Sequence, residues 1–136
     1  MNKKEEEHIL AVDPGRDKSG IAVLSMDSKV LNKDIIKSSD IKSYLLRLIN
    51  IYNIRNIIMG DGTFSGKIIE EIRSTLDIPI VMVDETYTTM EAEKRYYEEQ
   101  GGWKRFFPFI HWKPARPLDD YVAVVLGEKF LYKDKK

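Results

Sequence analysis

The chain has 136 residues, a length typical of one domain. Hydrophobic residues make up 43% and charged residues 32%, a globular composition that excludes a disordered chain. Basic and acidic residues number 22 each, so the zero net charge argues against a globally basic nucleic-acid binder but allows a local basic patch. The absence of cysteine excludes disulfides, a thiolate zinc site and a cysteine nucleophile.

The composition also bounds location and domain organisation. No apolar run approaches the ~20 residues that a membrane span needs, and the charged N-terminus lacks the apolar region of a secretory signal. We therefore expect a cytoplasmic protein with no membrane partner. Residues 1–7 are expected to form a polar tail, 8–132 a single domain and 133–136 a charged tail. A monomer and a homodimer are both open.

The first part of the chain predicts three short strands. Apolar runs cover residues 8–13, 20–25 and 30–36. Turn residues separate them, beginning with Pro14 and Gly15. Three consecutive strands with short connections favour an antiparallel meander.

Helices and strands then alternate. Apolar residues at helical spacing predict helices after Ser39 or Asp40, from Ser65, from Thr88 or Thr89 to about residue 100, and over about 118–132. Residues 56–60 and 78–85 are expected to be strands, the second of them buried. Strands joined by helices pair in parallel. The expected fold class is therefore α/β, with helices packed on a mixed five-stranded sheet.

Acidic residues lie at the ends of these elements. Asp13 ends the first strand, Asp84 and Glu85 end the last strand, and Asp119 and Asp120 open the last helix. If the first and last strands lie near each other in parallel, their carboxyl ends share the edge where α/β sheets generally bind ligands. Converging carboxylates repel one another unless cations lie between them, and Mg²⁺ or Mn²⁺ suits oxygen ligands. This pattern is typical of phosphodiester hydrolysis with metal ions.

Each acid also has a purely structural interpretation. Asp13 suits a turn, Asp84 and Glu85 could solvate a strand end, and Asp119 could cap a helix. Side chains alternate along a strand, so only one of Asp84 and Glu85 would face the site if the strand continues. The choice between Asp119 and Asp120 is open as well.

The residues around the acids carry a family resemblance. Residues 11–22 contain Asp13-Pro14-Gly15 and Gly20, residues 83–92 contain Asp84-Glu85-Thr86-Tyr87-Thr88-Thr89, and residues 119–131 form an apolar helix after Asp119. Together with Gly60 and Gly66, these segments resemble the YqgF/RuvX family. Members are RNase H-like proteins described as Holliday-junction resolvases and as nucleases that process pre-16S rRNA. The resemblance runs from about Ile9 to Leu131.

The resemblance implies an RNase H-like fold and a metal-dependent nuclease. The substrate would be structured RNA, such as an rRNA precursor, or branched DNA. Matched position by position, the catalytic acids would be Asp13, Glu85 and Asp119. These three, with Asp120 in reserve, would hold Mg²⁺ or Mn²⁺. Water would then attack the phosphodiester in line, and the 3′-hydroxyl would leave.

Two departures from the family pattern favour an alternative function. Thr86 replaces the usual arginine, and Asp61 replaces the proline that usually follows the first glycine of the middle motif. The alternative is a non-catalytic nucleic-acid-binding or interaction module. Residues 13–20 also resemble the phosphate motif of actin-like ATPases, but one lobe of this length cannot supply their cleft.

Basic residues near the acids are candidates for binding nucleic acid. The expected loop 101–117 combines aromatic and basic residues without an acid, and its candidates are Trp103, Lys104, Arg105, Trp112, Lys113 and Arg116. Cations neutralise phosphates and aromatic rings stack on bases. Equally, the aromatic residues could form a small cluster over the sheet. Arg16 and Lys18, just after Asp13, either contact phosphate or belong to a solvated turn.

Overall fold

A five-stranded mixed sheet forms the centre of the protein. The computed structural model describes residues 6–99 and 117–134. Its strands are β1 (Glu7–Asp13), β2 (Lys18–Ser25), β3 (Val30–Lys37), β4 (Asn53–Gly60) and β5 (Ile80–Val83), in the order β3-β2-β1-β4-β5. The β1–β2 and β2–β3 pairs are antiparallel, whereas β1–β4 and β4–β5 are parallel. The predicted meander and the mixed sheet are both confirmed.

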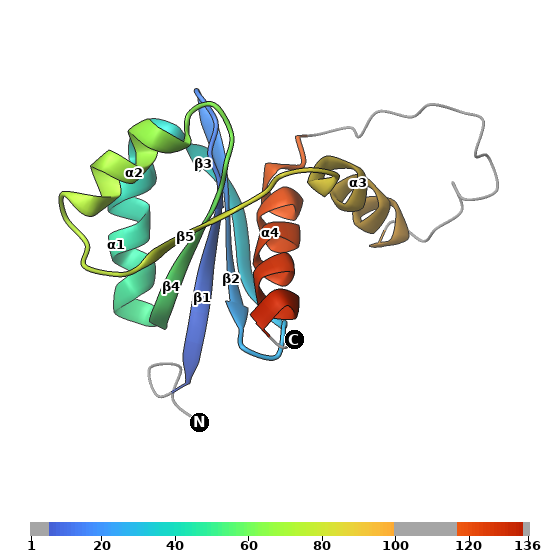
Figure 1. Cartoon of the computed structure of the whole chain (residues 1–136), viewed down its shortest axis with the longest axis horizontal. Helices are drawn as coiled ribbons and strands as arrows, with labels where there is room; N and C mark the ends of the chain where they lie inside the picture. Colours follow the sequence, from blue (N-terminus) through green and yellow to red (C-terminus); the bar gives the residue numbers. More distant parts are fainter. Residues whose placement is uncertain (1–5, 100–116, 135–136) are drawn as a thin grey trace.

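The helices form a layer on each face of the sheet. A short 3₁₀ turn η1 (Ser38–Asp40) leads into α1 (Ile41–Ile51), followed by α2 (Ser65–Arg73), α3 (Thr88–Glu99) and α4 (Asp119–Asp134). Figure 1 shows α1 and α2 on one side of the sheet and α4 on the other, with α3 beside α4. The described helices contain none that is long and apolar enough to cross a membrane.

Alternation along β1 divides the apolar core between these two layers. Leu10 and Val12 pack in the cluster that includes side chains of α1 and α2. Ile9 and Ala11 pack in the cluster that includes α4. All four are fully buried, so β1 is covered on both faces. The same alternation aims Asp13, the last residue of β1, toward the α4 layer.

The last strand differs most from the sequence prediction. β5 spans only Ile80–Val83, lies at the edge of the sheet and is partly exposed, so the prediction of a buried strand over 78–85 was wrong. An edge strand pairs on one side only, which leaves its side chains less covered. The first and last strands are parallel but not adjacent, because β4 lies between them. Asp84 and Glu85 follow the end of β5, so strand alternation does not choose between them.

Candidate active site

Three of the predicted acids meet at one cavity. The cavity, of about 410 Å³, lies at the carboxyl end of β1 and beside the first turns of α3 and α4. Asp13, Glu85 and Asp119 line it, although they come from three distant parts of the sequence. The other lining residues are Thr88, Thr89, Glu93, Pro117, Leu118 and Val122. The carboxylates therefore face a space that opens to solvent between two helices.

Asp61, the residue that follows β4, holds the backbone of Glu85 in place. The backbone N–H of Glu85 donates a hydrogen bond to the Asp61 carboxylate at 3.1 Å, and the Asp61 N–H donates to the Val83 carbonyl at 3.2 Å. A proline at position 61 could donate no such bond. On the α3 side, the Glu85 carbonyl accepts bonds from the Thr88 hydroxyl at 2.6 Å and the Thr88 N–H at 3.0 Å. Asp61 therefore has a structural role at this departure from the family pattern.

The residues on either side of Glu85 are held by α4 and by each other. Lys129 of α4 donates hydrogen bonds to the Asp84 carbonyl at 3.2 Å and to the Thr86 carbonyl at 2.5 Å. The Thr86 N–H and hydroxyl both donate to the Asp84 carboxylate, at 2.8 and 2.5 Å. These bonds, with help from Lys129, keep the pKa of Asp84 below its usual value. The exposed Asp84 carboxylate thus accepts hydrogen bonds from Thr86, whereas Glu85 lines the cavity.

The electrostatics of the cavity indicate that positive charge is needed there. Burial raises the pKa of Asp13 from 3.8 to about 8, and hydrogen bonding to Glu85, the Glu85 charge and Asp119 add to the effect. Burial also raises the pKa of Asp119, while hydrogen bonding to Asp13 and the Lys18 charge oppose that rise. The buried Oε1 of Glu85 receives no bond from any N–H or hydroxyl group of the described residues. At neutral pH, Asp13 retains a proton that a cation could replace.

Two glycines let these acids approach. A Cβ at Gly60 would lie 2.2 Å from Oε1 of Glu85, and one at Gly20 would lie 1.8 Å from the Asp119 carbonyl oxygen. Gly20 is also the partner of Asp13 in the β1–β2 ladder. The lack of a side chain at Gly20 therefore allows the start of α4 to pack beside Asp13.

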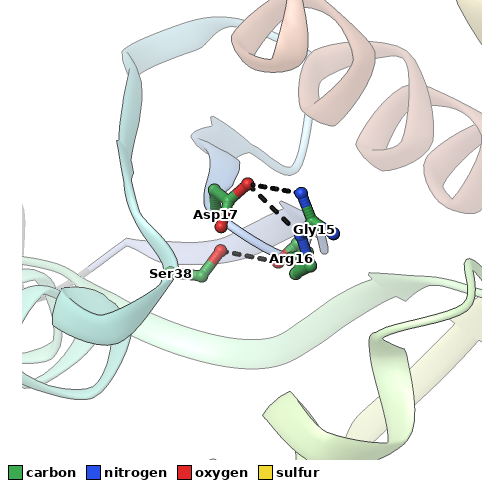
Figure 2. Close-up of polar contacts among 4 residues, drawn as sticks. All are labelled: Gly15, Arg16, Asp17 and Ser38. Carbon is green, nitrogen blue, oxygen red and sulfur yellow. Dashed lines mark hydrogen bonds and ion pairs between the residues drawn. The ribbon is translucent and has the colours of Figure 1, made fainter.

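Other predicted residues lie elsewhere. Asp120 is buried and pairs with Lys33 of β3 at 3.4 Å, and it does not line the cavity. Arg16 is exposed on the turn between β1 and β2 (Figure 2), and Lys18 is exposed at the start of β2. The six candidates of the loop, Trp103, Lys104, Arg105, Trp112, Lys113 and Arg116, lie outside the described residues.

Sequence reasoning missed three residues around the site. Glu93 lines the cavity, and its spacing of four from Thr89 on one helix could have indicated it. The sequence indicated Asp61 only as a departure from the family pattern. Its hydrogen bond with the Glu85 N–H forms only in the folded sheet, so no local pattern predicts it. Lys129 acts on carbonyls more than forty positions away in the chain, and no local pattern indicates that contact.

The described residues contain no group of three or more acidic or histidine side chains already arranged as a metal centre. Asp13, Glu85 and Asp119 are nevertheless the set that could hold a divalent ion, because all are oxygen donors facing one space. The raised pKa values of Asp13 and Asp119 fit such an ion, as does the buried Oε1 of Glu85, to which no N–H or hydroxyl group of the described residues donates. The arrangement can therefore bind a cation and present it to an anionic ligand.

Comparisons with known proteins agree on fold and family. No family model matches the sequence. A Dictyoglomus thermophilum protein that carries the name "Putative pre-16S rRNA nuclease" is 35% identical over 139 residues, covering 90% of this chain and 94% of the relative. A Coxiella burnetii protein of the same name is 29% identical over 128 residues, covering 86% and 77%.

Solved structures match the fold. The Thermus thermophilus RuvC structure has a TM-score of 0.62 at 13% identity and covers 94% of this chain and 96% of its own. The large terminase nuclease of thermophilic phage G20c has a TM-score of 0.59 at 17% identity, covering 94% and 85%. The sheet order and these likenesses identify an RNase H-like fold. With a relative 35% identical over nearly all of both sequences, the chain belongs to the YqgF/RuvX family.

Proposed function

We propose that this protein is a divalent-metal-dependent nuclease that hydrolyses phosphodiester bonds in structured RNA, such as an rRNA precursor, or in branched DNA. The observation that carries the proposal is the convergence of Asp13, Glu85 and Asp119 on one cavity. Nuclease names among the relatives support it. Nucleic acid is the expected partner. A cytoplasmic location and a monomeric or homodimeric state stay predictions.

Asp13, Glu85 and Asp119 would hold Mg²⁺ or Mn²⁺. The buried Oε1 of Glu85 and the raised pKa values of Asp13 and Asp119 are what a site made for a cation is expected to have. When bound, a divalent ion supplies Lewis acidity for the attack of water on a phosphodiester.

The chain's own residues orient these ligands. The Asp61 carboxylate and Lys129 hold the backbone around Glu85, so its carboxylate enters the cavity from a defined direction. Asp13 is fixed by its place at the end of a buried strand, and Asp119 by its place in the first turn of α4. Such preorganisation reduces the cost of arranging the reacting groups. Lys18 adds a positive charge that acts on Asp119.

A cleavage panel tests the proposal. The purified protein is incubated with single-stranded RNA, an rRNA-precursor fragment, single-stranded DNA and a four-way junction, each with Mg²⁺, Mn²⁺ or EDTA. We expect cleavage of at least one substrate that requires metal and is lost in Glu85→Gln, which keeps the shape of the side chain but removes its charge. Binding without cleavage by a folded protein, indifferent to metal, would instead identify a non-catalytic module.

Lys129→Met should slow cleavage without unfolding the protein. Lys129 is a positioning residue, because it donates hydrogen bonds to the carbonyls that flank Glu85 and does not line the cavity. Loss of an outer contact of this kind typically lowers metal affinity or activity about 10- to 100-fold. We expect a higher Mg²⁺ requirement and a lower kcat, with a change in unfolding free energy below about 1 kcal/mol because both bonds are exposed. Lys129→Arg retains a donor and should restore most of the activity; equal rates in Lys129→Met and wild type would contradict the role.

A further inference from the structure

A basic groove lies beside the turn between β1 and β2. One cavity of about 230 Å³ is lined by Arg16, Ser39 and Lys67, among others. A second, of about 330 Å³, is lined by Arg16, Lys18, Lys37 and Ser39, with Asp17. The two cavities adjoin at Arg16 and Ser39, and we call them together the β1–β2 groove.

The charge of this groove is opposite to that of the carboxylate cavity. Four cations line it, Arg16, Lys18, Lys37 and Lys67, against two carboxylates, Asp17 and Glu71. The described lining of the carboxylate cavity contains four acids and no Lys or Arg. A polyanion would be repelled by that cavity alone, so affinity has to come from neighbouring positive charge.

One residue of the groove, Lys18, acts electrostatically on the carboxylate cavity. Lys18 lines the groove, and its charge acts on Asp119, a lining residue of the carboxylate cavity. The cations come from three separate elements: the β1–β2 turn and the start of β2, the end of β3, and α2. All four side chains belong to exposed residues, so they are available to a ligand in solution.

The turn that carries Arg16 is anchored to the protein interior. The buried Ser38 hydroxyl donates a hydrogen bond to the Gly15 carbonyl at 2.6 Å (Figure 2). The Ser19 and Ser38 hydroxyls lie 2.7 Å apart. The Ser38 N–H also bonds to the Asp17 carbonyl at 2.9 Å. Arg16 pairs with Asp17 at 3.2 Å, but both side chains are about three-quarters exposed, so this pair is weak and a phosphate can replace Asp17.

We infer that the β1–β2 groove binds the phosphodiester backbone of the substrate strand on the α1–α2 side of the carboxylates, with Arg16, Lys37 and Lys67 contacting phosphates. The inference rests on the proposed nuclease function and assigns a path to its substrate. Phosphate contacts position a strand without reading its sequence, so RNA and DNA strands share this chemistry. Arg16 and Lys18, close to Asp13 in the chain, were already candidates from the sequence. The groove adds Lys37 and Lys67 as phosphate-binding residues.

The salt dependence of binding tests the path. The double variant Lys37→Ala/Lys67→Ala is compared with wild type by fluorescence anisotropy of a fluorescein-labelled single-stranded RNA in EDTA, over a range of NaCl concentrations. Each phosphate contact on a single strand contributes about 0.7 to the slope of log affinity against log salt. We expect the magnitude of this slope to be smaller by about 1.4 in the double variant than in wild type. Lowering the salt from 1 M to 0.1 M should therefore strengthen binding about fivefold less for each lysine removed. A labelled single-stranded DNA should give the same change.

A matched control removes two charges elsewhere. Lys29→Ala/Arg55→Ala loses the same charge at the opposite end of the sheet, and it should bind almost as wild type does. Lys37→Arg/Lys67→Arg should retain the wild-type slope. If wild type binds and cleaves nucleic acid but the alanine double variant has an unchanged slope, the path is wrong and the nuclease stands. If wild type binds neither RNA, DNA nor a junction, both proposals fail.

Discussion

Asp13→Asn should lower metal-dependent cleavage by about 10³-fold or more, because single replacements within a catalytic set that acts as a unit cost that much. Asp13 interacts with both other acids, because Glu85 and Asp119 each raise its pKa. Asparagine keeps the size of the side chain and removes the charge that would hold the cation. The measurement is the cleavage rate at saturating Mg²⁺ on the best substrate of the panel.

The same variant should make the metal-free protein more stable at alkaline pH. The pKa of Asp13 is about 8 in the folded protein and 3.8 in the unfolded chain. Well below pH 3.8 Asp13 is protonated in both states and does not affect stability. As the pH rises from 4 to 8, only the unfolded chain gains from ionisation, so the folded protein loses stability relative to it. Asparagine cannot ionise and escapes that loss.

We expect Asp13→Asn to raise the free energy of unfolding in EDTA by about 1–3 kcal/mol at pH 8, and by little at pH 4. The gain is smaller than the full shift in the pKa of Asp13 implies, because Glu85 and Asp119 share the repulsion. Urea denaturation at both pH values measures it. Mg²⁺ should raise the Tm of wild type more than that of the variant. Asp77→Asn, at an exposed position, is the control for loss of one negative charge. If Asp13→Asn is no more stable than wild type at pH 8, ionisation of Asp13 does not destabilise the folded protein and the prediction is wrong.

Gly20→Ala should destabilise the fold and displace Asp119. The new Cβ would lie 1.8 Å from the carbonyl oxygen and 2.2 Å from the carbonyl carbon of Asp119, and both are backbone atoms that cannot rotate away. The first turn of α4 would have to move off β2. Overpacking of this kind costs about 1–3 kcal/mol, and we expect the upper end because Gly20 is buried.

Thermal and urea unfolding measure the loss in Gly20→Ala, and cleavage at a temperature where the variant is folded measures the displacement of Asp119. Gly66→Ala is the matched control: nothing lies within 4 Å of its added Cβ, and it sits within α2. Alanine in a helix is favoured over glycine by about 1 kcal/mol, so this variant should be as stable as wild type or more so. If Gly20→Ala and wild type have the same unfolding free energy, the start of α4 does not pack directly against Gly20.

Local patterns in the sequence were sufficient for the elements and for the acids at their ends. Apolar runs bounded by turn residues predicted the meander, and helical spacing predicted the helices that alternate with the later strands of the mixed sheet. Both signals are local, because they depend on residues close together in the chain. The motifs around Asp13, Glu85 and Asp119 indicated the family, and a relative 35% identical confirms it.

The tertiary structure decided which acids face one another and what holds them. Strand alternation did not choose between Asp84 and Glu85, and only the family resemblance favoured Glu85; β5 ends at Val83, and the Asp61 and Lys129 contacts leave Glu85 lining the cavity. Helical spacing likewise did not choose between Asp119 and Asp120; the resemblance favoured Asp119, and in the structure Lys33 pairs with Asp120. These choices depend on contacts between residues far apart in the chain. Such contacts have no period to detect, because they exist only once β1, β4 and α4 have packed together.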